Sequence, residues 1–134
     1  MAHRIDEIEG IAPSYSEKLY QHGIETTEDL LNACAQKKDR DELAGKIGIN
    51  EDMLLKWTKT ADLFRIRGIG KQYSELLEVS GIPTVKELRA QEAVGLSRKL
   101  HEMNARNKYS KINPSPHIVQ RWITQAKDLS LKIT

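Results

Sequence analysis

Two glycines and three cations near the middle of the chain have the types and spacing needed to bind phosphate. Gly68 and Gly70 alternate with apolar residues, and a helical apolar pattern begins directly after them. The first amides of a helix have no partner within the helix, and such a helix start is an anion site. Arg65, Arg67 and Lys71 add positive charge, so we predict a phosphate-binding turn. The other interpretation is an ordinary connection between two helices.

A second group of cations lies further along the chain, in a segment with few carboxylates. Between Arg98 and Arg121 there are six Lys and Arg residues and one acidic residue. Lys108 and Lys111 are interleaved there with Tyr109 and with Asn and Ser side chains, which can contact phosphate or sugar. We predict that Lys108 and Lys111 reinforce the phosphate contacts of the turn. The alternative is a solvated loop without a binding role.

No set of residues has a spacing typical of catalysis. The four histidines are scattered, none pairs with another His or with Cys34 at metal-ligand spacing, and no phosphate loop of the Walker type occurs. Cys34 lies among helical apolar residues, as a buried cysteine does. We therefore expect a protein that is not an enzyme and has no metal, cofactor or small-molecule substrate.

The composition favours a cytoplasmic protein without a membrane partner. The chain of 134 residues is 39% hydrophobic and 30% charged, as in soluble globular proteins. A single cysteine excludes an internal disulfide, and no apolar run approaches the length of a membrane span. The first residues lack the apolar core of a signal peptide.

Helices must position these residues, because no segment of useful length alternates apolar and polar residues. The patterns, caps and glycine stops predict about eight helices. In the first half they cover 13–22, a short segment capped by Thr26 or Thr27, a segment from the capping box of Asp39 and Glu42 to Gly48, and Asn50 to about Leu63. In the second half they cover 71–80, a short segment with the capping box of Thr84 and Glu87, 93–104, and 115–131, with an insertion at 105–113.

The sequence repeats itself at an offset of 58 residues. The phrase Ile8-Glu9-Gly10-Ile11-Ala12 corresponds to Ile66-Arg67-Gly68-Ile69-Gly70, and Tyr-Ser-Glu follows at the same distance in both. We predict two units, residues 1–64 and 65–134. Each unit is too small to bury its apolar face well alone, so we expect them to pack as one body.

Four aromatic residues hold equivalent places in the two repeats. The repeat resumes after a shift, in which Trp57 corresponds to Trp122, and these two residues are expected to anchor the two cores. Tyr15 and Tyr73 lie in the first turn of their helices, where the rings are expected to pack under the turns with the hydroxyls at the surface. Stacking on nucleic-acid bases is the alternative role of these tyrosines.

Charge is distributed unevenly along the chain. Residues 1–64 carry eight Lys and Arg and thirteen Asp and Glu, a net charge of −5, whereas residues 65–134 carry thirteen and six, a net charge of +7. The asymmetry indicates an interaction face on the second half, unless the two halves partly neutralise each other. The first turn has Ala12 in place of the second glycine and several carboxylates around it, which repel phosphate.

The repeated phrase, which continues in Gly23-Ile24-Glu25-Thr26 and Gly81-Ile82-Pro83-Thr84, resembles the helix-hairpin-helix motif of DNA-binding proteins. It is most similar to a bacterial family of unknown function with two such units, and its second part also resembles segments of the RNA polymerase alpha C-terminal domain and of recombinases. The resemblance covers about Ile8 to Leu129. It implies an all-α fold of tandem helix-hairpin-helix (SAM-like) units, whose hairpin amides hold duplex DNA without reading sequence.

Two functions follow from these features. The first is sequence-independent binding of DNA, through the set Arg65, Arg67, Gly68, Gly70, Lys71, Lys108 and Lys111. The second is an adaptor for a protein partner, built on the same scaffold after DNA binding has been lost. The acidic first turn and the overall charge of +2 favour the adaptor, and the basic second half favours nucleic acid.

Overall fold

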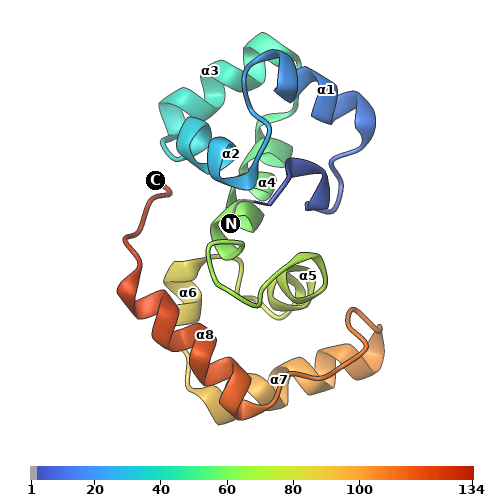
Figure 1. Cartoon of the computed structure of the whole chain (residues 1–134), viewed down its shortest axis with the longest axis vertical. Coiled ribbons are helices and arrows are strands. Elements are labelled where there is room, and N and C mark those ends of the chain that lie inside the picture. Colours follow the sequence, from blue (N-terminus) through green and yellow to red (C-terminus); the bar gives the residue numbers. More distant parts are fainter. Residues whose placement is uncertain (1–2) are drawn as a thin grey trace. The chain divides into compact units, whose positions relative to one another are not determined.

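The computed structural model describes residues 3–134 (Figure 1), so the first two residues of the predicted first unit lie outside it. Among the described residues there are eight α-helices, a short 3-10 helix and no strand, which confirms the predicted all-α class. The elements are η1 (Ile5–Glu7), α1 (Pro13–Gln21), α2 (Thr27–Cys34), α3 (Lys37–Ile47), α4 (Glu51–Leu63), α5 (Lys71–Val79), α6 (Val85–Arg89), α7 (Ala93–Arg106) and α8 (Pro116–Asp128).

The chain divides into two compact units. The first extends to Arg65 and also includes Lys132–Thr134, and the second is Ile66–Leu131. The first unit contains α1–α4 and the second contains α5–α8. The final residues are fixed within the first unit, because the Arg40 guanidinium donates to the Thr134 carbonyl at 3.0 Å and the Thr134 amide donates to the Ala35 carbonyl at 2.9 Å.

Each unit has a core built around one tryptophan. In the first unit α2 packs against α4, and in the second α6 and α7 pack against α8. Trp57 and Trp122 are each 2% exposed, which confirms the predicted anchors. Cys34 is fully buried in the first core, as predicted, and this burial raises the pKa of its thiol to about 11.

The two turns of the sequence repeat make equivalent contacts. Gly10 has a φ of 95° and Gly68 a φ of 96°, in the left-handed region that favours glycine. A Cβ atom at Gly10 would lie 3.3 Å from Nε1 of Trp57, and one at Gly68 would lie 3.2 Å from Nε1 of Trp122. In both units the turn backbone therefore passes close to the indole nitrogen, where a side chain would be crowded.

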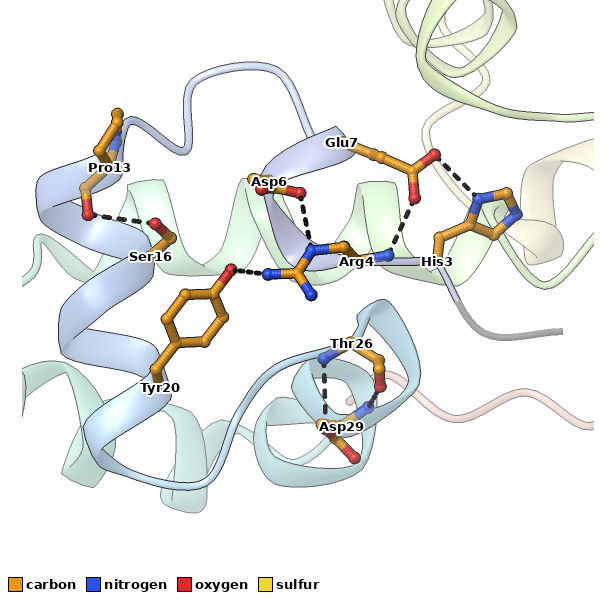
Figure 2. A network of polar contacts seen from close by, with 9 residues as sticks. All are labelled: His3, Arg4, Asp6, Glu7, Pro13, Ser16, Tyr20, Thr26 and Asp29. Atoms are coloured by element: carbon orange, nitrogen blue, oxygen red, sulfur yellow. Dashed lines mark hydrogen bonds and ion pairs between the residues drawn. The ribbon is translucent and has the colours of Figure 1, made fainter.

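Most of the predicted helix ends are correct. The Thr26 hydroxyl accepts from the Asp29 amide at 3.0 Å, and the Asp29 carboxylate accepts from the Thr26 amide, so the predicted capping box forms (Figure 2). Asn50 and Ser115 cap α4 and α8, and Gly48 ends α3 with a φ of 68°.

Other predicted ends were wrong. Helix α3 begins at Lys37, so Asp39 and Glu42 lie inside it instead of forming its capping box. Thr84 does precede α6, but its hydroxyl donates to the Glu87 carboxylate and makes no cap to the backbone. Helix α7 continues to Arg106, and α8 ends at Asp128, before the predicted end near Leu131.

We expect the Thr26→Ala substitution to lower the free energy of unfolding by about 1 kcal/mol, because it removes a formed N-cap.

Hydrogen bonds from the amides of Glu25 and Thr26 lower the pKa of Asp29. A lowered carboxylate pKa stabilises the fold above the unfolded pKa, and this contribution disappears as the pH falls through the folded pKa. Thermal melts of wild type and Asp29→Asn should therefore differ at neutral pH and converge in acid; a constant difference would contradict this role.

Candidate functional site

The predicted phosphate-binding turn spans 66–70 and leads into α5, whose N-cap is Gly70. Its side chains divide into a buried and an exposed set. Ile66 and Ile69 are each 1% exposed and hold the turn on the core of the second unit, whereas Arg67 and Lys71 are exposed. The local fold thus places two predicted cations at the surface beside the helix start.

Gln125 of α8 fixes the shape of this turn, and the sequence did not single it out. Its Oε1 accepts from the Arg67 amide at 2.8 Å, and its Nε2 donates to the Arg67 carbonyl at 3.2 Å. One side-chain amide therefore satisfies both backbone groups of a residue 58 positions away. Gln125 lies three residues after Trp122, and the residue three after Trp57 in the first repeat is Thr60, so a comparison of the repeats could have marked Gln125 as a difference.

The backbone amides of Gly68 and Gly70 have no hydrogen-bond partner within the described part of the chain. The first turn differs, because the Ala12 amide donates to the Gly10 carbonyl at 3.2 Å. At the position of Gly70 the second turn consequently offers a backbone donor that the first turn uses internally at Ala12.

The charged side chains around the two turns differ in the same way as their amides: those around the second turn favour an anion and those around the first do not. The carboxylates around the first turn are exposed, at Asp6, Glu7, Glu9 and Glu17. Arg4, the cation before it, is engaged: its guanidinium donates to the Tyr20 hydroxyl at 2.7 Å and lies 3.7 Å from the Asp6 carboxylate (Figure 2). Anions are therefore repelled at the first turn and attracted at the second.

Arg65 is placed differently from the other predicted cations. It belongs to the first unit, its side chain is 15% exposed, and its guanidinium donates to the Asp62 carboxylate at 2.7 Å. A phosphate would compete with this ion pair, so we expect a smaller contribution from Arg65 than from Arg67.

The predicted basic insertion forms an ordered loop, 107–115, that is tied to α7 by one buried amide. Asn104 is 8% exposed, and its Oδ1 accepts from the amides of Tyr109 at 2.8 Å and Ser110 at 3.1 Å. Its Nδ2 donates to the Ser110 carbonyl at 3.1 Å and to Asn113 Oδ1 at 2.8 Å. These bonds fix the backbone on which Lys108 and Lys111 are carried, both with exposed side chains.

Tyr73 connects this loop to the helix that follows the turn. Its ring lies 5.1 Å from that of Trp122, as the expected packing under the turn requires, and its hydroxyl donates to the Ile112 carbonyl at 3.1 Å. The orange loop after α7 accordingly lies beside α5 in Figure 1. The hydrogen bond places the backbone of Ile112, the residue after Lys111, at the end of the Tyr73 side chain of α5.

We expect the Asn104→Ala substitution to lower the free energy of unfolding by about 2 kcal/mol, because it leaves buried backbone groups of the loop without partners. Denaturant unfolding measures this change. Asn107→Ala is the matched control, since Asn107 lies exposed in the same loop and should change stability by less than about 0.5 kcal/mol. Equal effects of the two substitutions would contradict the role of Asn104 as the anchor of the loop.

Comparisons with known proteins give one result. A family model described as a domain of unknown function (DUF4332) matches residues 9–129. Neither the curated proteins nor the solved structures gave a significant match. No helix in residues 3–134 has both the length and the apolar character needed to cross a membrane.

Proposed function

The chain belongs to the DUF4332 family, whose description assigns no activity, and from its own residues we propose that it binds duplex DNA without catalysis and without reading sequence. In this proposal its units are helix-hairpin-helix units, and the turn at 66–70 is the hairpin that holds a phosphate. The amides of Gly68 and Gly70 donate to the phosphate oxygens, and Arg67 and Lys71 neutralise the backbone around them. Lys108 and Lys111 extend the contact from the neighbouring loop, and the protein acts in the cytoplasm.

Gly70 is the observation that carries the proposal. Its φ is −118°, outside the left-handed region, and a Cβ atom there would meet nothing within 4 Å. The equivalent residue of the first unit is Ala12, so this position of the turn accepts a side chain. The fold therefore does not require glycine at position 70. The Gly70 amide has no partner among the described residues, and close approach of a ligand to this amide accounts for the presence of glycine at position 70.

We expect Gly70→Ala to weaken duplex DNA binding about tenfold, since it obstructs a charge-assisted hydrogen bond of about 1.5–3 kcal/mol. Its thermal stability should change little, because only a modest N-cap preference is lost. Gly68→Ala is the matched control and should lower the melting temperature, because its positive φ and its contact with Trp122 exclude a side chain. Fluorescence anisotropy and thermal melts measure both, and unchanged binding of Gly70→Ala would remove the main support for the proposal.

The adaptor function is the second candidate, and the first turn favours it. In that turn the Ala12 amide is already hydrogen-bonded to the Gly10 carbonyl, and the surrounding carboxylates are exposed, so the turn suits a basic protein surface better than a phosphate. An adaptor would show no DNA binding at low salt and would keep its protein partner when the second turn is neutralised. A titration of wild type with duplex DNA at two salt concentrations separates the two functions.

A further inference from the structure

Ile112 is the most exposed large apolar residue in the described part of the chain. Its exposed fraction is 71%, against 51% for the next two. Its backbone is nevertheless fixed, because its carbonyl accepts hydrogen bonds from the Tyr73 hydroxyl at 3.1 Å and from Ser110 Oγ at 2.9 Å. Neither bond involves the Ile112 side chain. The conformation of the loop therefore does not explain why this position is apolar.

The surroundings of Ile112 are cationic. Lys111 precedes it directly, Lys108 lies in the same loop, and both are exposed. The loop follows Arg106 and lies on the unit that begins after Arg65, in the basic half of the sequence. An apolar side chain held on a fixed backbone among lysines suits a polyanion with an apolar surface between its charges. One isoleucine offers too little apolar area to hold a membrane, even with neighbouring lysines.

We propose that the Ile112 side chain enters the minor groove of the duplex DNA bound by the second turn, while Lys108 and Lys111 contact phosphates at the groove edge. This inference rests on the proposed function and adds a groove contact to it. The minor groove is about 6 Å wide, and groove-binding proteins place Ile and similar side chains there. Tyr73 serves as the positioning residue, because it joins Ile112 to the helix that starts at the phosphate-binding turn.

The Ile112→Ala substitution tests the contact, with Val94→Ala as the matched control on an exposed apolar residue of α7. Labelled duplex DNA is titrated with each protein over a range of salt concentrations. We expect Ile112→Ala to weaken binding about tenfold, as the loss of a few buried carbon atoms implies. The slope of affinity against salt should stay unchanged, because no cation is removed. Val94→Ala should bind as wild type does, and both variants should melt at the wild-type temperature.

A minor-groove-binding polyamide identifies the groove. When it occupies the duplex, wild type should bind only as tightly as Ile112→Ala, and the variant should be unaffected. Unchanged affinity of Ile112→Ala, or an equal loss on single-stranded DNA, would overturn the groove contact and leave the phosphate contacts of Lys71 standing. Loss of binding to anionic vesicles alone, with duplex binding intact, would overturn it in favour of a lipid surface. Failure of wild type to bind any duplex would remove the proposed function, and this inference with it.

Discussion

The double substitution Arg67→Glu and Lys71→Glu should abolish detectable binding of duplex DNA at physiological salt. Both cations are exposed beside the unpartnered amides of the second turn, so the reversal replaces attraction of phosphate by repulsion at the point of contact. Wild type is expected to bind with a dissociation constant of roughly micromolar or weaker, with a salt slope of about −0.9 for each phosphate contacted. Anisotropy titrations at several salt concentrations measure both quantities.

Two controls separate a local contact from net charge. The double substitution Lys38→Glu and Lys46→Glu makes the same change in charge on exposed residues of α3 and should leave most of the affinity intact. Glu9→Ala removes a carboxylate from the first turn and should not weaken binding. If reversal on α3 is as damaging as reversal at the second turn, binding depends on overall charge and the turn is not the contact site.

Replacing Trp122 by alanine should lower the free energy of unfolding by about 3–5 kcal/mol, enough to unfold much of so small a protein. Its indole is 2% exposed, lies beneath Gly68 and packs against the Tyr73 ring at 5.1 Å. Trp57→Ala should cost a similar amount, because Trp57 makes the corresponding contacts with Gly10 and with Tyr15 at 5.2 Å. Denaturant unfolding followed by circular dichroism measures these losses.

Val94→Ala serves again as the control, since truncating a half-exposed side chain should change stability by less than about 0.5 kcal/mol. Trp57→Phe and Trp122→Phe keep an aromatic ring and should retain part of the stability that alanine loses. Unchanged stability of either alanine variant would contradict the assignment of the two indoles as the centres of their cores.

The helices and their cores were largely predictable, because they depend on residues close together in sequence. Apolar spacing located the eight helices and the two buried tryptophans, and the capping box at Thr26 involves atoms only three residues apart. The capping rules failed at α3 and α6, where nearby side chains formed other hydrogen bonds or ion pairs. Helix α3 begins earlier than predicted, and Lys37 and Asp41 form an ion pair of 2.7 Å in its first turns. Before α6, the Thr84 hydroxyl bonds to the Glu87 carboxylate instead of the backbone.

The cap of α7 was missed for a related reason. Glu92 accepts hydrogen bonds from the amides of Val94 and Gly95, and these bonds lower its pKa. Glutamate is not among the preferred N-cap residues, so its spacing carries no signal that the sequence alone would reveal.

The sequence by itself determined which residues of the candidate site are cationic or glycine, and that a helix follows them. Only the tertiary structure decided how they are held and which donors stay open. Gln125 reaches Arg67 across 58 positions, and Tyr73 reaches Ile112 across 39. Periodicity and capping report interactions within a few turns of one helix, whereas these contacts exist only after separate helices have packed, and so no local pattern predicts them.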